Sequence, residues 1–255
     1  MRRLLAIAGN TFRETMRDRI LFSFLFFAAL MLLTSAAMEQ VTIGDGDHVV
    51  RSVALGAIRV FGSVVALFLG IGLVYKELEK KTIYTIASKP IPRWIFVLGK
   101  YAGLMAVIAV LIGLMVALYF VVMTVQQDFP GFGIAPAIFL LMVELGLLTA
   151  WAILFSTYSS PTVASVFSIG ILVIGHAADD IWTFGSQAKS EMAQEMSRVI
   201  YWVLPNFEVF NAFDSAMHGI PIGGERLLWS TLYGLGYTAA VLAVACWIFE
   251  KRDFK

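Results

Sequence analysis

The chain has 255 residues, of which 59% are hydrophobic and 15% are charged, and its formal net charge is +1. Soluble domains carry about 25% charged residues, so this composition excludes a water-soluble core as the main architecture. The sequence has neither a polybasic tail nor a basic face interleaved with aromatic residues, so no nucleic-acid partner is expected. Its single cysteine, Cys246, excludes an intrachain disulfide.

Six long apolar runs alternate with short charged segments along the chain. Each run can cross a hydrocarbon layer about 30 Å thick, which takes about 20 helical residues at about 1.5 Å per residue. We therefore predict an all-α polytopic membrane protein with one transmembrane domain over residues 1–255, six spans within 20–249 and a tail at 250–255. The runs are Ile20–Met38, Val53–Tyr75, Tyr101–Thr124, Pro136–Tyr158, Thr162–Trp182 and Leu227–Phe249.

The basic residues lie mostly on one side of this alternation. With the N-terminus inside, 14 of them fall in inner segments and four in outer ones, while Arg59 lies within the second run. Inner segments of membrane proteins carry the excess of Lys and Arg, so both termini are predicted to be cytoplasmic. The inner set is Arg2, Arg3, Arg13, Arg17, Arg19, Lys76, Lys80, Lys81, Lys89, Arg93, Lys100, Lys251, Arg252 and Lys255.

Residues 1–19 have the pattern of an amphipathic helix. At about 3.6 residues per turn, the apolar and the polar side chains fall on opposite arcs. A basic helix of this kind favours the cytoplasmic headgroup layer, where anionic lipids of the bilayer attract it. The alternative is a solvated, frayed terminus. The apolar arc contains Leu4, Leu5, Ala8, Phe12 and Met16, and the polar arc contains Asn10, Arg13, Glu14 and Arg17.

Arg59 and Glu144 are charged residues that lie deep inside the apolar runs. Arg59 lies about six residues into the second run from its outer end and Glu144 about eight into the fourth, which places them at similar depths of roughly 9 and 12 Å. Isolated charges there are costly and usually face the bundle interior with a partner. We hypothesise that the two pair or share a polar outer cavity, either fixing helix packing or lining a path. Alternatively, Arg59 reaches the headgroups and Glu144 is protonated.

The inner segment Lys76–Lys100 contains a short predicted helix, from about Glu77 to Ser88. Pro90 and Pro92 end it, because proline cannot continue a helix. The segment carries Ile83, Tyr84 and Ile86, and such apolar side chains on a projecting helix suit docking into a groove of a cytoplasmic partner. An ordinary charged hairpin is the alternative, but it leaves those three residues in water.

The outer connection Thr183–Arg226 contains two apolar-studded segments, Gln187–Trp202 and Phe210–Met217. Their helical spacing predicts lateral helices beside the outer leaflet. Aromatic residues that favour the membrane interface lie in or beside the connection. The helices could cap the exit of a path or receive an extracytoplasmic partner, and the alternative is a plain loop. The aromatic residues are Trp182, Tyr201, Trp202 and Trp229.

Enzymatic interpretations have little support in the sequence. The three histidines are scattered and lack the spacing of a metalloprotease, so no metal site and no catalytic residue is expected. An intramembrane serine hydrolase would need a Ser and a His that meet at depth. His176, Asp179 and Asp180 form one polar group at the outer end of the fifth run, which we interpret as a solvated helix end rather than a site.

Several motifs together resemble the permease subunits of ABC-2 type ATP-binding-cassette transporters. The N-terminal amphipathic helix resembles the elbow helix of that family, and Phe249–Phe254 resembles its usual ending. Six spans with both ends inside also match, and the most similar variety is the small permease encoded with a separate ATPase in nitrous-oxide reductase maturation clusters. The signature after the second span is carried by Glu77, Thr82, Pro90, Arg93 and the Gly99-Lys100 pair.

This resemblance implies a permease of the inner membrane, and we expect it to be an exporter. The chain lacks a G-x-x-x-x-G-K-[ST] loop, so ATP and Mg²⁺ are expected on a separate ATPase and no cofactor in this chain. Two permeases, as a homodimer, and two ATPases would form the working unit. The alternatives are a mechanical subunit acting on a periplasmic partner and an intramembrane hydrolase. The implied coupling residues are Glu77, Thr82, Tyr84, Ile86, Pro90 and Arg93.

Overall fold

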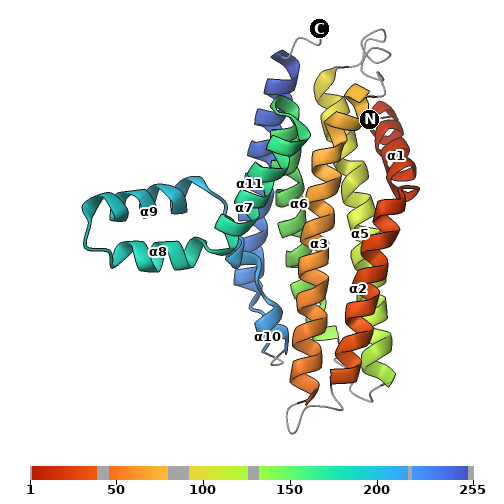
Figure 1. The fold of residues 1–255 in the computed structure, drawn as a ribbon, viewed down its shortest axis with the longest axis vertical. Helices are drawn as coiled ribbons and strands as arrows, with labels where there is room; N and C mark the ends of the chain where they lie inside the picture. The colour runs from red at the N-terminus through yellow and green to blue at the C-terminus, as the bar shows by residue number, and fades with distance from the viewer. Residues whose placement is uncertain (1, 39–45, 80–91, 126–131, 218–219, 252–255) are drawn as a thin grey trace.

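The computed structural model describes residues 2–38, 46–79, 92–125, 132–217 and 220–251. Every regular element in these ranges is a helix, in agreement with the all-α prediction. Long helices form an upright bundle, and a pair of shorter helices projects from its side (Figure 1). The bundle helices are α2 (Arg19–Met38), α3 (Gly46–Glu79), α5 (Arg93–Val125), α6 (Ala135–Tyr158), α7 (Pro161–His176) and α11 (Gly224–Lys251).

Helix α6 is the centre of the bundle. It packs against α11, α3 and α7, and 17 of its 24 residues are buried. A helix that is apolar on all sides is suited to such a position, and Pro136 in its first turn removes a backbone N–H that would have no helical partner. The buried hydroxyl of Thr149 donates to the Leu145 carbonyl at 2.7 Å, so it needs no partner from another helix.

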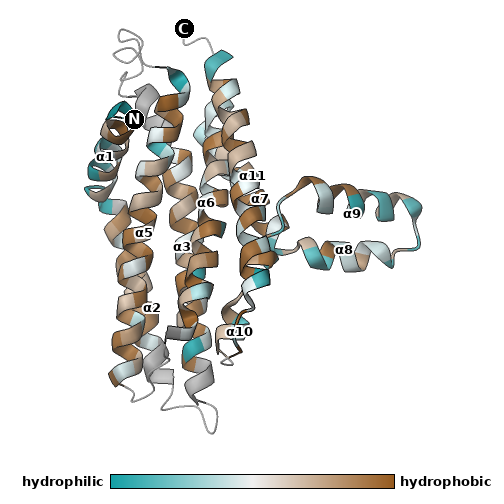
Figure 2. Cartoon of the chain, turned by 180° about the vertical axis from the view of Figure 1, so that it is seen from behind, coloured by the Kyte–Doolittle hydropathy of each residue, from teal (hydrophilic) through white to brown (hydrophobic). Residues whose placement is uncertain are grey.

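The outer surface of the bundle is apolar (Figure 2). In water, exposed side chains as large as Phe26 on α2, Val166 on α7 and Trp247 on α11 would form unfavourable patches, whereas lipid chains cover them without penalty. Among the described residues, four helices are long and apolar enough to cross a membrane, namely α3, α5, α6 and α11. The chain is therefore a multi-pass membrane protein.

The six-span count remains a prediction at α2 and at α7. The described apolar stretch of α2, Leu21–Thr34, is shorter than a full span. The fifth expected span, Thr162–Trp182, is not one continuous helix as predicted: α7 ends at His176, and α8 (Ala178–Ser186) departs at 61°. Counted as one broken span, α7 and α8 bring the total to five.

The break between α7 and α8 occurs where a later segment of the chain contacts the end of α7. The backbone N–H of Phe207 donates to the Gly175 carbonyl at 2.9 Å, so a later segment of the chain takes an acceptor at the end of α7. A side chain at Gly175 would collide with the Phe207 ring, so glycine permits this close approach. Asp179, in the first turn of α8, suits the positive end of the new helix dipole.

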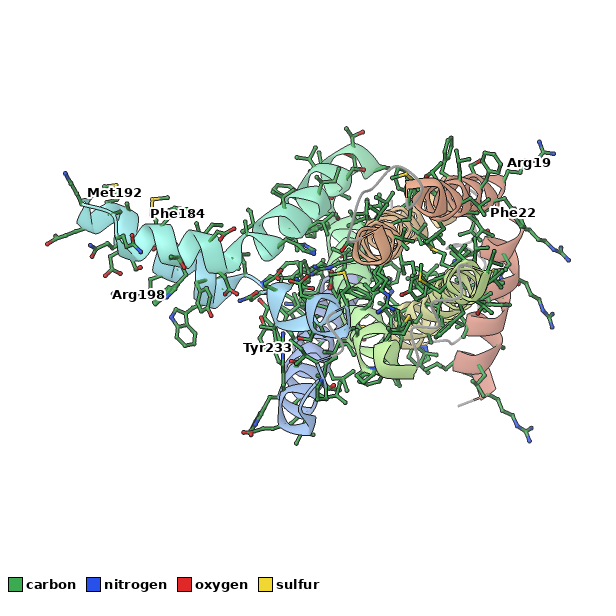
Figure 3. All side chains as sticks on the ribbon, turned by 90° about the horizontal axis from the view of Figure 1, so that it is seen from below. Arg19, Phe22, Phe184, Met192, Arg198 and Tyr233 are labelled. Carbon is green, nitrogen blue, oxygen red and sulfur yellow. The ribbon has the colours of Figure 1, made fainter. Side chains whose placement is uncertain are left out.

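Helices α8 and α9 (Glu191–Val203) form a lateral hairpin that projects far from the bundle (Figures 1 and 3). Gly185 lies directly against Ser197 where the two helices cross, and the Trp182 and Tyr201 rings pack at 5.0 Å. Of the two lateral segments expected from the sequence, Gln187–Trp202 forms α9, whereas its partner α8 lies largely within the expected fifth span. The other expected segment, Phe210–Met217, packs against the bundle and is not lateral. The place of the hairpin beside the outer leaflet remains a prediction. The short elements η2 (Glu208–Phe210) and α10 (Phe213–Met217) then return to the bundle, and η1 (Phe132–Ile134) precedes α6.

Helix α1 (Arg2–Met16) packs along α5 near the end of the bundle where α11 finishes (Figure 1). Gly99 and Gly103 make this contact possible, because a side chain at either would meet Ile7 or Thr11 of α1. The predicted N-terminal helix is therefore present as a packed element. Its position in the headgroup layer, as an elbow helix, remains a prediction.

Candidate functional site

Four charged or titratable side chains from four elements meet inside the bundle. They are Arg59 of α3, Glu144 of α6, His176 of α7 and Glu208 of η2, here called the charge cluster. The Arg59 Nη2 atom lies 3.4 Å from Glu144 Oε2, so the structure brings together the two residues that the sequence analysis paired. The Glu144 side chain is 1% exposed, and that of Arg59 is 16% exposed.

Close helix packing brings α3 and α6 within reach of this ion pair. Gly62 of α3 faces Leu145, the neighbour of Glu144, and Gly70 faces Ala152 two turns further along. Because neither glycine has a side chain, the α3 and α6 backbones approach closely, and the long Arg59 side chain can reach Glu144. The ion pair therefore depends on small residues elsewhere in the same interface.

His176 contacts the other oxygen of the same carboxylate. Its Nε2 atom lies 3.2 Å from Glu144 Oε1, and its Nδ1 atom lies 2.8 Å from the Leu172 carbonyl oxygen. The ring also packs against Phe207, with centroids 5.3 Å apart. The last residue of α7 is thereby held between α6 and the segment that follows α9.

Glu208 connects the buried pair to a polar network nearer the surface. Its Oε2 atom lies 3.9 Å from Arg59 Nη2, and Asn211 donates to its other oxygen. Asn206 accepts from the Glu208 backbone N–H at 2.9 Å and donates to Asp179 of α8 at 2.7 Å. A continuous polar path thus leads from Glu144 to the base of the lateral hairpin.

The buried carboxylate needs these partners. A hydroxyl inside a helix can donate to its own backbone, but a carboxylate has only acceptors and must find donors on other elements. Removing one partner of a buried ion pair costs about 3–5 kcal/mol, because the other charge is left without compensation. Ionisable groups inside a membrane bundle are expensive and are commonly functional, so the charge cluster is the candidate site.

Comparison with known families identifies the class of protein. The sequence profile of the family described as "ABC-2 family transporter protein" matches residues 5–254, nearly the whole chain. The chain belongs to this family. It is therefore a membrane permease subunit of an ABC transporter, and membership implies an ABC ATPase as partner. A comparison with curated proteins finds no match.

Family membership also bears on the enzymatic alternative. ABC-2 permeases are the membrane subunits of transporters and are typically not catalytic themselves, so an intramembrane hydrolase receives no support. Within the described ranges, no group of three or more His, Cys, Asp or Glu side chains is placed to hold a metal ion.

Most of the expected coupling residues of this ABC-2 permease lie outside the described residues. They are Thr82, Tyr84, Ile86 and Pro90. Glu77 belongs to the last turn of α3, and Arg93 begins α5 at the same end of the bundle. The structure therefore describes the two helices that the expected coupling helix would join.

Arg93 has a structural partner in the permease itself. Its Nη1 atom donates to the carbonyl oxygens of Phe249 at 3.2 Å and Glu250 at 3.0 Å, at the C-terminal end of α11. A cation is favourable there because the last carbonyls of a helix lack backbone donors and carry partial negative charge. The Phe96 and Phe249 rings stack beside it at 5.7 Å. Arg93 thus joins α5 to α11.

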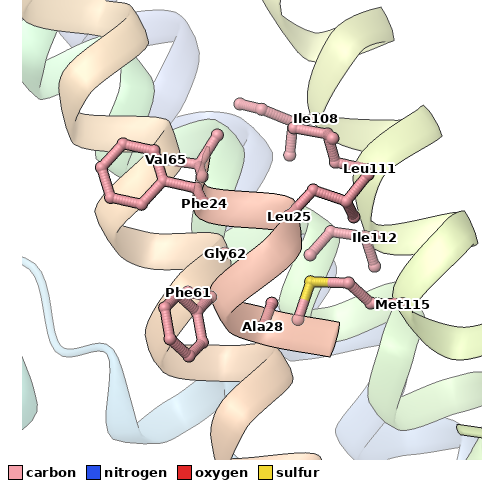
Figure 4. A pocket seen from close by; sticks show the side chains of 10 residues that line it. All are labelled: Phe24, Leu25, Ala28, Phe61, Gly62, Val65, Ile108, Leu111, Ile112 and Met115. Atoms are coloured by element: carbon pink, nitrogen blue, oxygen red, sulfur yellow. The ribbon is translucent and has the colours of Figure 1, made fainter. Parts of the chain in front are cut away.

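An apolar hollow lies between α2, α3 and α5 (Figure 4). Its volume is about 10 Å³, at the lower limit of what holds one water molecule. The lining contains no charged side chain, and Gly62 and Ala28 leave the space where α2 meets α3. We interpret the hollow as a loosely packed seam rather than a solute site.

Sequence reasoning missed two members of the charge cluster. It interpreted His176 as part of a solvated helix end, and this is wrong: the ring contacts the buried Glu144, while Asp179 and Asp180 are exposed. Glu208 was not singled out at all. The available signal was depth, because His176 and Glu144 both lie near the outer ends of their runs.

Proposed function

We propose that this permease is the membrane-spanning subunit of an ABC exporter in the inner membrane, with six spans and both termini in the cytoplasm. It would work as a homodimer with two copies of a separate ATPase, which binds ATP and Mg²⁺. The proposal rests on one observation: an ABC-2 family profile matches residues 5–254 of a chain whose sequence lacks a phosphate-binding loop. The distribution of 14 inner and four outer basic residues supports the orientation.

Helix α3 offers a mechanical route from the ATPase to the charge cluster. In the proposal, a coupling helix from about Glu77 to Ser88 docks on the ATPase through Tyr84 and Ile86. Because α3 is one continuous helix from Gly46 to Glu79, a displacement of its cytoplasmic end would reach Arg59 without an intervening joint. ATP-driven closure of the ATPase pair would then switch the bundle between two packings.

The charge cluster is the element that such a movement would open. Arg59 lies on α3, while its partners lie on α6, α7 and η2, so sliding of α3 would separate it from them. Separated charges in the membrane demand water or a polar solute, and the cluster would then line the transport path. The lateral hairpin, beside the outer leaflet, would cap its exit.

A mechanical subunit is the second candidate. The lateral hairpin exposes large apolar side chains, including Met192 at 74% and Trp202 at 75%, on a helix whose other face is charged. Such a face suits the outer leaflet or a periplasmic partner that receives force from the ATPase. A transport assay with the reconstituted complex distinguishes this function from export of a solute.

Co-purification tests the proposed partnership. The tagged permease should bring down an ATPase that binds ATP, and Tyr84→Asp or Ile86→Asp should abolish this while membrane insertion stays intact, since a charge in an apolar contact weakens docking. Met196→Asp, on the exposed face of α9, is the control and should retain the ATPase. A wild-type chain that never co-purifies with an ATPase would refute the partnership.

Thiol labelling in intact cells tests the orientation. In a Cys246→Ser background, a cysteine at Lys89 should resist a membrane-impermeant reagent, because the inner segments carry the basic excess. A cysteine at the exposed Arg198 of α9 should react, which makes it the matched control. Labelling at Lys89 would overturn the topology.

A further inference from the structure

Each nitrogen of the His176 ring lies beside an oxygen atom. One is a carbonyl oxygen, which can only accept a hydrogen bond, and the other is a carboxyl oxygen, which can donate only when Glu144 is protonated. Nδ1 lies 2.8 Å from the Leu172 carbonyl oxygen, and Nε2 lies 3.2 Å from Glu144 Oε1. A neutral imidazole has a single N–H, so it can satisfy one of these contacts only. The carbonyl has no proton to give, which assigns the ring N–H to Nδ1 and leaves a lone pair on Nε2.

The carboxylate side of the contact also lacks a hydrogen-bond donor. Glu144 Oε1 is buried and has no aligned hydrogen-bond donor among the described residues, although Nε2 is close. If Glu144 were ionised and His176 neutral, a buried negative charge would lie 3.2 Å from an Nε2 atom that carries no proton. Their contact becomes favourable only when a further proton lies between them, on either atom.

The charges of the surrounding elements support the same conclusion. Arg59 of α3 and Glu208 of η2 cancel formally, Asp179 of α8 is engaged by Asn206, and the Tyr233 hydroxyl of α11 accepts from the Asn206 backbone. Without the extra proton, the Glu144–His176 pair adds one net negative charge to this cluster. With it, the pair is neutral, which a buried site strongly favours.

We propose that Glu144 and His176 form one proton-binding site inside the bundle, and that the bound proton holds the bend between α7 and α8. His176 is the last residue of α7, and α8 begins two residues later at Ala178. Loss of the proton makes the 3.2 Å contact repulsive, so the end of α7 moves away from α6. The direction of the lateral hairpin therefore depends on protonation.

This inference goes beyond the proposed function and does not depend on it. Both measurements below use the full permease in lipid nanodiscs without ATPase or substrate. A failure here would leave the partnership with an ATPase intact, and the reverse also holds.

Spectroscopy tests the proton. In a His48→Asn, His218→Asn background, His176 is the single histidine, so the ring nitrogens of isotope-labelled histidine report on it alone. Infrared difference spectra against Glu144→Gln report whether the Glu144 carboxyl is protonated. At neutral pH we expect either a doubly protonated ring or a protonated carboxyl. A singly protonated ring, in either tautomer, together with an ionised Glu144 would overturn the proposal.

Distance measurements test the bend. Spin labels at Met196 of α9 and Leu114 of α5, both exposed, are introduced in a Cys246→Ser background and diluted with unlabelled chain. The pH is raised from about 5 to 8, or further until the spectra show that the proton has left. Over this range the distance between the two labels should change in parallel with the spectroscopic signal. Glu144→Gln keeps a donor facing Nε2 and should lose the shift, while Glu195→Gln on α9 should retain it. A distance that stays constant as the proton leaves would overturn the coupling to the bend.

Discussion

Two ion pairs join the same types of side chain in opposite environments. In the bundle, Arg59 and Glu144 lie 3.4 Å apart with side chains 16% and 1% exposed. On the lateral hairpin, Arg198 and Glu195 lie 2.9 Å apart with side chains 55% and 65% exposed. The shorter contact is the weaker one energetically, because water solvates either partner once the other is removed. Burial, rather than distance, decides what a pair contributes.

The bundle and the lateral hairpin also differ in how many neighbouring elements pack against them. Helix α6 is surrounded by α3, α7 and α11, so most of its side chains are constrained by several neighbours. In the lateral hairpin, α8 and α9 pack chiefly on each other and meet the bundle at the α7 bend. A change in the bundle should therefore affect the whole fold, whereas a change in the hairpin should stay local.

The largest expected effect is at Arg59. Arg59→Met keeps an apolar stem but leaves Glu144 buried without its cation, and should destabilise the permease by about 3–5 kcal/mol in denaturant titrations in mixed micelles. The double variant Arg59→Met, Glu144→Gln removes both charges and should recover most of the loss. A single variant as stable as wild type would show that Glu144 does not need Arg59.

Next in size is the α3–α6 interface at Gly70. An added methyl group would lie 2.5 Å from Ala152 Cβ and 3.2 Å from the Thr149 carbonyl, both on the well-packed α6. Gly70→Ala should therefore separate the helices and cost about 1–3 kcal/mol in the same titration. Gly113→Ala on α5 meets nothing within 4 Å and should leave stability unchanged. Equal stabilities of the two variants would contradict tight packing at Gly70.

The next smaller effect is expected at Arg93, whose contacts are intermediate in burial between those of the two ion pairs. It reaches two carbonyls at the end of α11, one in a part-buried and one in an exposed contact, so Arg93→Gln should cost about 0.3–1 kcal/mol. Arg93→Lys keeps the charge and should retain part of the stability. If Arg93→Gln leaves stability unchanged but lowers ATPase co-purification, its role lies in coupling instead of in the α5–α11 contact.

The smallest effect is expected on the hairpin. Arg198→Met removes the cation from the exposed pair with Glu195, and should change the free energy of unfolding by about 0.2–1 kcal/mol. It is the matched counterpart of Arg59→Met, measured in the same titration. A loss as large as at Arg59 would reverse the comparison and indicate that the hairpin pair is buried by lipid or by a partner.

Depth arguments place Arg59 and Glu144 at similar heights in the bundle because they depend on the length of the apolar runs alone. Arg59 and Glu144 lie at similar distances from the outer ends of their runs, and the spans run roughly parallel through the bilayer, so similar depth allows the two side chains to meet. His176 has a similar depth, but its neighbours Asp179 and Asp180 indicate a solvated helix end in the sequence. Glu208 follows a loop, where depth has no meaning before the chain is folded.

Apolar run length could not predict the bend after His176. The run Thr162–Trp182 is mostly apolar up to Gly175 and carries His176, Asp179 and Asp180 near its outer end, and both a straight span with a solvated end and a broken span satisfy this composition. The bend is stabilised by Phe207, whose backbone N–H donates to the Gly175 carbonyl and whose ring packs on His176. A contact between residues separated by about thirty positions has no local signature.

The sequence by itself determined that this is an all-helical membrane protein of the ABC-2 family, because hydrophobic length and family motifs are properties of the chain read in order. The tertiary structure alone decided that Arg59, His176 and Glu208 meet around the buried Glu144, and that α8 leaves the bundle sideways. The physical reason is that a buried charge is stable only where several elements supply partners at once, and which elements do so is settled by packing.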